Sequence, residues 1–355
     1  MIVADLSNDW LQRSLDVVMA TEQSLLTVIH VPGHHHLHMQ AESASIAALI
    51  ERFAAGEALE SQALPRFDLA PPLPDKAGYA TNQQIDLIDF LSLTGCSLQV
   101  NLGRRNTQLG RTASPSQRLL LDLEFLDLAP ACIELLETRG DTELAATIRV
   151  ASDDRKQALP SAVFDAVLLG AEWRAFWHAD STLGDYPQQT SSLVEQTVTS
   201  LSAMTAPWLN GNWSADNRAF ELLLSDVRAG DGGELLLATS QLVWALERAN
   251  ALLTKTQSER PLCPFGQSTE RSRALQRVVQ QFFVGNVQPW VVSLRRRAEL
   301  IHEPTQRLET VLTNSVTQPY QDWVMARDAL LLQLTRMTRQ HVQAVQATLT
   351  SCQQD

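Results

Sequence analysis

Residues 114–130 read SPSQRLLLDLEFLDLAP, and they begin as a helix begins. Ser114 can accept a hydrogen bond from the main-chain N–H of Gln117, whose side chain can reach back to the cap. Pro115 fits the first helical position. Leucines then recur at spacings of three and four, the period of one helix face: Leu119, Leu120, Leu123 and Leu126. We therefore expect a helix from Ser114, which Pro130 ends or kinks.

The same helical pattern recurs on both sides of this segment. Before it, Thr81 or Asn82 can cap a helix that runs to about Leu102, and a polar connection follows over residues 103–113. After it, we expect helices over residues 142–150, 160–177, 191–204, 215–227, 234–253, 269–284, 289–299, 305–316 and 320–348. Strand signals are scarce, because alternating runs of Val, Ile, Thr or Tyr are short. The sequence predicts an all-α fold, an irregular multi-helix bundle without significant β-sheet.

Proline and glycine content divides the chain. Pro65, Pro71, Pro72 and Pro74 fall within ten residues, which forbids a helix and favours an extended connection. We expect an N-terminal helical portion over residues 1–63, a Pro-rich linker over 64–80 and a helical body over 81–355. Gly230-Asp231-Gly232-Gly233 marks a turn between helices, so the body can subdivide near residues 228–233.

Composition excludes several classes of protein. Hydrophobic residues make up 45% of the 355 and charged residues 19%, which is typical of a chain with a large core and not of a disordered one. The formal net charge of −12 argues against a general nucleic-acid binder, which needs a basic surface. No run reaches the roughly 18 apolar residues of a transmembrane segment. Residues 1–30 lack the basic start and apolar core of a signal peptide.

Motifs that carry chemistry are missing from the sequence. We find no nucleophile motif, no phosphate-binding Gly-rich loop and no paired acidic frame, and we predict no catalytic residue and no cofactor. His34, His35, His36 and His38 form a tract that fits no specific metal site, because adjacent residues do not converge on one ion, so we expect a surface loop of open role. His178 and His341 are isolated, and Trp173, Phe176 and Trp177 form a stripe typical of a core. No metal site is predicted.

Two groups of arginines stand out. The polar connection and the helix start after it contain six residues that can hold an anion or tie the loop together: Arg104, Arg105, Asn106, Arg111, Ser116 and Arg118. The structural role is favoured, because a long loop has many main-chain groups to satisfy and each Arg carries five donors. Consecutive residues point in different directions on a helix, so Arg295-Arg296-Arg297 is interpreted as a solvated or helix-end cluster.

Two blocks of sequence resemble a known family. The first comprises residues 85–91, Cys96, residues 105–106, 109–111 and 114–120, and Leu128-Ala129-Pro130-Ala131-Cys132-Ile133; the second comprises Leu262-Cys263-Pro264, Val287-Gln288-Pro289-Trp290 and Cys352. Together they resemble the bacterial envelope family catalogued as domain of unknown function 3080, whose members are predicted lipoproteins without an assigned activity. The resemblance implies a periplasmic or membrane-anchored protein and supplies no catalytic residue. Such proteins usually begin with a signal peptide and a lipidated Cys, whereas the first Cys here is Cys96, so a cytoplasmic location is the alternative.

The four cysteines are predicted to pair. Cys132 lies on a stripe with Leu128, Leu135 and Leu136 and could meet Cys96 across a helix pair, while Cys263 lies in a loop and Cys352 ends the last helix. We expect the disulfides Cys96–Cys132 and Cys263–Cys352, each stabilising the fold by about 2–4 kcal/mol. The alternative is four free thiols in a cytosolic protein.

Two classes of function remain open on the sequence alone. The first is a non-catalytic binding or structural module of the envelope, with a protein or lipid partner, and the lack of a catalytic frame favours it. The second is an enzyme whose site is assembled from residues distant in sequence. The identity of the partner and the oligomeric state are not determined by these residues.

Overall fold

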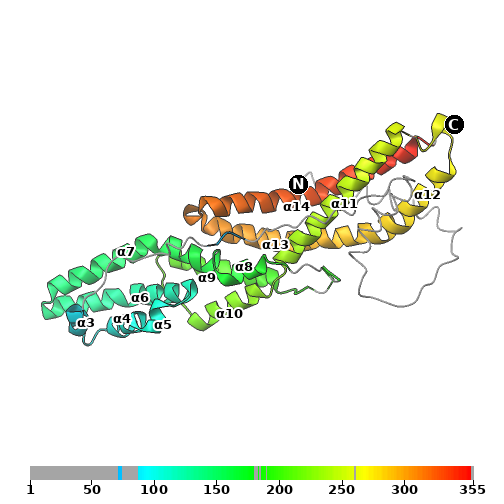
Figure 1. Ribbon diagram of the computed structural model, residues 1–355. Helices are drawn as coiled ribbons and strands as arrows, with labels where there is room; N and C mark the ends of the chain where they lie inside the picture. Colours follow the sequence, from blue (N-terminus) through cyan, green and yellow to red (C-terminus); the bar gives the residue numbers. More distant parts are fainter. Residues whose placement is uncertain are drawn as a thin grey trace. The chain divides into compact units, whose positions relative to one another are not determined.

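The computed structural model describes residues 71–73, 87–179, 183, 185–188, 190–259 and 261–352, all within one unit, His38–Asp355. These residues form helices and no strand (Figure 1), and the predicted all-α class is confirmed. The predicted N-terminal portion with its His34–His38 tract lies outside the described residues, as does the 64–80 linker apart from 71–73. The division into these parts stays a prediction.

The helices follow one another along the chain, and the connection between α8 and α9, residues 177–193, is long. The first group is α3 (Leu87–Ser92), α4 (Leu98–Asn106), α5 (Gln108–Arg111), α6 (Pro115–Arg139) and α7 (Thr142–Val167). The next is α8 (Ala171–Phe176), α9 (Val194–Leu209) and α10 (Asn217–Arg228). The last comprises α11 (Gly232–Glu259), the 3₁₀ turn η1 (Pro264–Gly266), α12 (Glu270–Val278), the π-helix η2 (Val279–Val287), α13 (Gln288–Val311), the 3₁₀ turn η3 (Thr313–Ser315) and α14 (Gln318–Thr350).

Helix α6 begins as the sequence predicts. The Gln117 N–H donates to Ser114 Oγ at 3.2 Å, and Pro115 occupies the first turn. The helix ends at Gly140, which has φ +83°, a conformation that glycine adopts without steric cost. This tight end lets α7 return along α6 as an antiparallel partner (Figure 1).

Three prolines that the sequence analysis treats as helix boundaries lie inside helices. Helix α6 continues across Pro130, α7 across Pro160 and α13 across Pro304, so a helix end at Pro130 and helix starts at residues 160 and 305 are wrong. The physical reason is burial on both sides of each proline. Leu126, Ala129 and Cys132 are all in the core, so packing against neighbouring helices outweighs the hydrogen bond that Pro130 does not make.

The expected single helix ending near Leu102 is instead two helices. Helix α3 ends at Ser92 and α4 starts at Leu98, with Gly95 at φ +92° in the break between them. This break places Cys96 beside α6, where it forms the predicted disulfide with Cys132 at a Cα–Cα distance of 5.3 Å. The connection after Leu102 is also more helical than expected, since α4 runs to Asn106 and is followed by α5.

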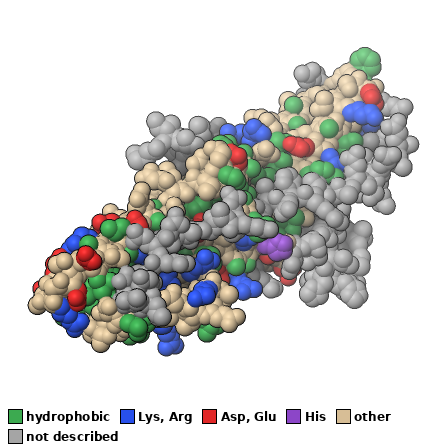
Figure 2. All heavy atoms as spheres, turned by 60° about the vertical axis from the view of Figure 1, so that its left-hand side comes forward, with side chains coloured by type: hydrophobic (Ala, Val, Ile, Leu, Met, Phe, Trp, Pro, Cys, Tyr) green, Lys and Arg blue, Asp and Glu red, His purple; other side chains and the backbone are tan. Residues whose placement is uncertain are grey.

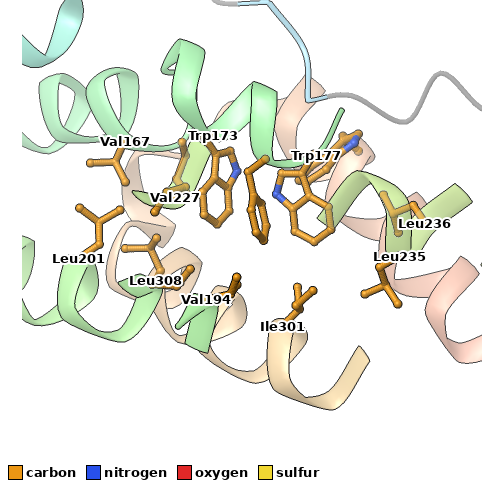
Figure 3. Close-up of a cluster of buried hydrophobic side chains, with 14 of the residues drawn as sticks. Val167, Trp173, Trp177, Val194, Leu201, Val227, Leu235, Leu236, Ile301 and Leu308 are labelled. Atoms are coloured by element: carbon orange, nitrogen blue, oxygen red, sulfur yellow. The ribbon is translucent and has the colours of Figure 1, made fainter. Parts of the chain in front are cut away.

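A cluster of buried hydrophobic side chains fills the core where the α8 segment meets α7, α9, α10, α11 and α13 (Figure 3). Trp173, Phe176 and Trp177 of the α8 segment are at most 2% exposed, so this stripe is core as predicted. The α8 segment packs directly onto the Gly230–Gly233 turn. A Cβ on Gly233 would lie 2.2 Å from the His178 carbonyl carbon, and one on Gly230 would lie 2.4 Å from the Phe176 ring. Glycine is therefore needed at both positions for the α8 segment to approach this turn closely.

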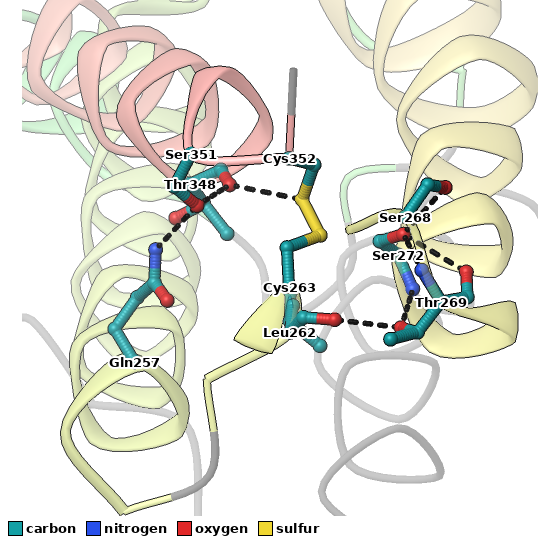
Figure 4. The surroundings of a disulfide bond; sticks show 9 residues. All are labelled: Gln257, Leu262, Cys263, Ser268, Thr269, Ser272, Thr348, Ser351 and Cys352. Atoms are coloured by element: carbon teal, nitrogen blue, oxygen red, sulfur yellow. Dashed lines mark hydrogen bonds between the residues drawn. A yellow bond between two sulfur atoms is a disulfide. The ribbon is translucent and has the colours of Figure 1, made fainter. Parts of the chain in front are cut away.

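The C-terminal helices pack as a long group in which α11 runs beside α14 and α13 continues from η2 (Figure 1). The second predicted disulfide, Cys263–Cys352, joins the loop after α11 to the end of α14, with a Cα–Cα distance of 5.0 Å (Figure 4). Thr269 Oγ1 donates to the Leu262 carbonyl at 2.6 Å and fixes the same loop to the start of α12. Both predicted disulfides are thus present, and no cysteine is free.

Candidate functional site

The predicted arginine loop lies against α6 and directs its first arginine to a carboxylate there. Arg104 of α4 forms an ion pair with Glu124 and is half exposed. Asn101, one turn earlier, donates to Glu124 Oε2 at 2.8 Å and to the Leu121 carbonyl at 3.0 Å. These bonds join α4 to α6. Figure 2 shows acidic and basic side chains lying next to one another at this end of the molecule.

Arg105 is directed to a deeper carboxylate. It pairs with Asp122 of α6, which is 1% exposed. Arg155 of α7, itself 2% exposed, donates from Nε to the same Asp122 oxygen at 3.2 Å and lies over the Phe125 ring at 3.8 Å from its centroid. One buried carboxylate therefore connects α4, α6 and α7 through two guanidinium groups.

The other predicted loop residues are held separately. Arg118 donates from Nε to the Ala113 carbonyl at 3.0 Å, and Ser116 Oγ donates to Glu221 Oε1 of α10 at 3.2 Å. Burial raises the pKa of Asp165, and the charge of Arg118 partly offsets that rise. Asn106 and Arg111 are exposed at the ends of α4 and α5. Four of the six residues, Arg104, Arg105, Ser116 and Arg118, are thus directed to four different partners.

A groove of about 430 Å³ lies beside this loop. Of the six predicted loop residues, Arg104 lines it. The other lining residues come from the α4–α5 connection, from α5 and the connection after it, from α6 and from the start of α10: Thr107, Leu109, Gly110, Ala113, Gln117, Leu120, Leu121, Glu124 and Asn217. Leu109 is 83% exposed at this groove, whereas Leu120 and Ala113 are buried. Among the described lining residues, the charged ones are Arg104 and Glu124, which pair with each other.

The sequence analysis did not find a buried polar chain that joins α8, α13 and α14. Trp173 Nε1 donates to Tyr320 OH at 3.0 Å, and Tyr320 OH donates to Glu309 Oε1 at 3.0 Å. Arg327 donates to both oxygens of Glu309 and, through Nε, to Asp328 Oδ1 at 2.8 Å. Hydrogen bonds and charges from Glu309 and Asp328 raise the pKa of Arg327 although burial alone would lower it.

This polar chain reaches the surface at a histidine. His302 Nε2 lies 3.1 Å from Asp328 Oδ1, and both side chains are 30% exposed. Burial favours a higher pKa for Asp328, but the hydrogen bond from His302 and the charge of Arg327 lower it. Arg327 also lies 5.1 Å from the Trp177 ring and 5.0 Å from the Trp323 ring. Nε, Nη1 and Nη2 of Arg327 all donate to Glu309 or Asp328. The guanidinium group therefore stabilises the packing of α13 on α14.

A second buried centre involves the basic triplet. Arg297 is 6% exposed and holds Asp231 with two hydrogen bonds, one of them 2.8 Å from Nε to Oδ2. The interpretation of the whole triplet as a solvated cluster is therefore wrong for Arg297. Burial and the neighbouring charge of Asp231 raise the pKa of Tyr186, whose carbonyl accepts a bond from Trp290 Nε1 at 2.8 Å. An arginine on the core face of a helix with no local acidic partner is the signal that could have indicated this pair.

A small apolar cavity lies where the π-helix η2 meets α11 and α14. Its volume is about 20 Å³, and it is lined by Leu253, Leu275, Val278, Val279, Phe282, Phe283, His341 and Val345. His341 Nδ1 lies 2.8 Å from Asn250 Oδ1, and its ring is 4.9 Å from that of Phe283. Burial lowers the pKa of His341 to about 4. The imidazole is therefore neutral at pH 7, a core histidine with one polar partner.

In the described part of the chain, no group of three or more His, Cys, Asp or Glu side chains is placed to hold a metal ion. None of the helices described combines the length and the hydropathy that a membrane span requires.

Comparison with known proteins gives one match. No curated protein and no solved structure matches the chain. The model of a family described as protein of unknown function, DUF3080, matches residues 46–355, which include every helix described above. The resemblance seen in the two sequence blocks is thus extended over most of the chain, and the protein belongs to the DUF3080 family.

Proposed function

We propose that the protein is a non-catalytic helical module of the cell envelope that binds a protein partner through the groove beside the α4–α5 connection. The observation that supports this proposal is that the buried charged side chains form ion pairs between elements of the fold. Arg105 and Arg155 meet at Asp122, Arg297 meets Asp231, and Arg327 meets Glu309. Each of these pairs braces one element against another. None of these residues lines the groove, so the charged groups in the interior serve the scaffold.

The lining of the groove indicates the chemistry of the partner. Leu109 is 83% exposed, and the adjacent Leu120 and Ala113 are buried, so an apolar side chain entering here would gain contacts on several sides. Arg104 is already paired with Glu124. An anionic lipid headgroup would meet no unbalanced positive charge from the described residues of the lining, which favours a protein partner over a lipid surface.

The disulfides support the envelope location. All four cysteines are paired, and disulfides persist in oxidising compartments such as the bacterial periplasm. The location can be tested by lysing cells in acid, unfolding the protein and adding a maleimide that increases its mass. Unreacted cysteines before reduction and four reacted ones after it would support the proposal, whereas immediate reaction of all four would contradict it.

A photo-crosslinking amino acid at Leu109 tests the partner-binding site in living cells. We expect a discrete protein adduct from position 109 and none from Val150, a matched apolar residue on α7 that is 47% exposed. After identification by mass spectrometry, the partner is purified and its affinity measured. Leu109→Asp should weaken binding at least about tenfold and Val150→Asp should not. Adducts with lipid only, equal adducts from both positions, or equal affinity of the two variants would overturn the proposal.

A further inference from the structure

Helix α14 carries an apolar stripe on the side opposite its buried face. The buried side chains recur along one face: Tyr320, Trp323, Arg327, Leu330, Leu334, Met337 and His341. On the opposite face, Met325 is 60% exposed and Leu332 is 70% exposed, with the exposed Ala329 between them. We call this face the outer seam of α14 and define it by Gln318, Asp322, Met325, Ala329, Leu332 and Arg336.

The spacing of the outer seam is that of a helix made to pack against another helix. Successive seam residues are four, three, four, three and four positions apart, which is the repeat of a coiled-coil interface. Its apolar members are central and its polar members are at the ends. Ala329 in the middle has a small side chain, which lets two helices approach closely. Among the described helices, α11 and α13 pack against α14, and Met325 and Leu332 on the seam stay exposed.

The charges on the seam indicate what covers it. Asp322 lies seven residues before Ala329 and Arg336 seven residues after it, which is about 10 Å in each direction along the helix. Gln318 donates to Asp322 Oδ1 at 2.8 Å and holds that carboxylate near the seam. A second α14 laid antiparallel, with the twofold axis near Ala329, places Asp322 of each copy opposite Arg336 of the other. A parallel arrangement would instead oppose like charges.

We infer that the outer seam of α14 binds a second copy of this chain, in an antiparallel pair of α14 helices. The contact is isologous, so each favourable pair occurs twice. The seam extends over only about five turns, and its buried area falls at the low end for specific interfaces. With a net charge of −12 on each copy, repulsion elsewhere opposes association. The dimer is therefore weak and depends on protein concentration.

The first test measures the mass of the intact chain in solution at physiological salt. Light scattering and sedimentation over a concentration series should show a monomer of 39.3 kDa that converts to a species of twice that mass. Leu332→Asp should raise the dissociation constant at least about tenfold. Thr335→Asp, a change at an exposed position of α14 outside the seam, should leave it within about twofold. Circular dichroism and the Tm of each variant show whether it remains folded.

Charge reversal tests the orientation. Asp322→Arg and Arg336→Asp should each weaken the dimer, and the double variant should recover most of the loss because the reversed charges meet again. A disulfide test avoids changing those charges: Ala329→Cys should cross-link two copies under mild oxidation, since cysteines near a twofold axis approach within the roughly 7 Å limit, whereas Thr335→Cys should not. A monomer at every concentration, a double variant weaker than both single ones, or equal cross-linking from positions 329 and 335 would overturn the inference.

Discussion

Arg327 of α14, which is fully buried, shares two hydrogen bonds with Glu309 of α13, whose side chain is 11% exposed. Nη1 donates to Oε1 at 2.6 Å and Nη2 donates to Oε2 at 2.9 Å, while Arg327 is 0% exposed. Removing both charges from water is costly, and their attraction offsets that cost only while both are present. The packing of α13 on α14 is therefore sensitive to the replacement of either residue.

Replacing Arg327 with Met should lower the free energy of unfolding by about 3–5 kcal/mol, because Glu309 would remain as an uncompensated buried charge. Urea unfolding followed by circular dichroism measures this loss. Arg307→Met is the matched control on α13, since Arg307 is 54% exposed and pairs with the exposed Glu303. The control should change the free energy by no more than about 0.5 kcal/mol. Equal losses in the two variants would contradict a stabilising role for the Arg327 pair.

His341 should make stability depend on pH in acid. Burial lowers its pKa from 6.5 to about 4, so the unfolded chain takes up a proton at a higher pH than the folded chain does. The contribution of neutral His341 is fully present above pH 6.5 and is lost as the pH falls toward 4. One pKa unit corresponds to about 1.4 kcal/mol, so the total is roughly 3 kcal/mol.

The measurement compares the native chain with His341→Gln, which can still donate an N–H to Asn250. Unfolding free energies are measured at several pH values between 4 and 7. The unfolding free energy of the native chain minus that of the variant should decrease as the pH falls, because only the native chain loses the contribution of neutral His341. The other titrating groups are common to both proteins and cancel in the difference. A difference that stays constant across this range would contradict burial as the cause of the pKa shift.

The two disulfides should contribute unequally. Cys96 and Cys132 are 36 positions apart and Cys263 and Cys352 are 89 apart, and a longer closed loop restricts the unfolded chain more. Replacing either pair with serines should lower the free energy of unfolding by about 2–4 kcal/mol, and the loss should be about 0.8 kcal/mol greater for the longer loop. Urea unfolding of both double variants gives the comparison, and a larger loss for the Cys96–Cys132 pair would contradict the loop-length argument.

Gly233 should not tolerate even a methyl group. A Cβ at this position would lie 2.2 Å from a main-chain carbon of His178, which cannot move aside as a flexible side chain can. We expect Gly233→Ala to lower the Tm and to cost about 1–3 kcal/mol. Gly103→Ala in α4 is the matched control, because its Cβ would meet the Phe90 ring at 3.8 Å, an ordinary contact. The control should stabilise the protein by about 0.5–1 kcal/mol, and a stabilising effect at both positions would show that the close approach at Gly233 is wrong.

Local sequence patterns predicted the features of the fold that depend on neighbouring residues. The cap at Ser114, the leucine stripe after it and the aromatic stripe of α8 depend on residues within a few positions of one another, and each was predicted. The boundaries assigned to Pro130, Pro160 and Pro304 failed because helix ends there depend on contacts with other helices. The low helix propensity of proline is a weak guide to helix ends when the residues on both sides of it are buried.

The buried ion pairs show why the polar interior could not be derived from one sequence. Arg297 and Asp231 are 66 positions apart, and Arg155 and Asp122 are 33 apart. An arginine can face solvent or bind a buried carboxylate, so its place is known only once the helices are packed. The arginine loop was identified as a notable feature, but its carboxylate partners on α6 came from the structure.

The disulfide at the end of α14 also changes what a protease can do to this protein. Cys263 and Cys352 close a covalent ring that includes α12, η2, α13 and α14. A cut at any single peptide bond inside this ring opens it but releases no fragment, because both new ends stay attached through the sulfur bridge. A nicked chain therefore keeps all its helices on one molecule, and only reduction together with cleavage would separate the pieces.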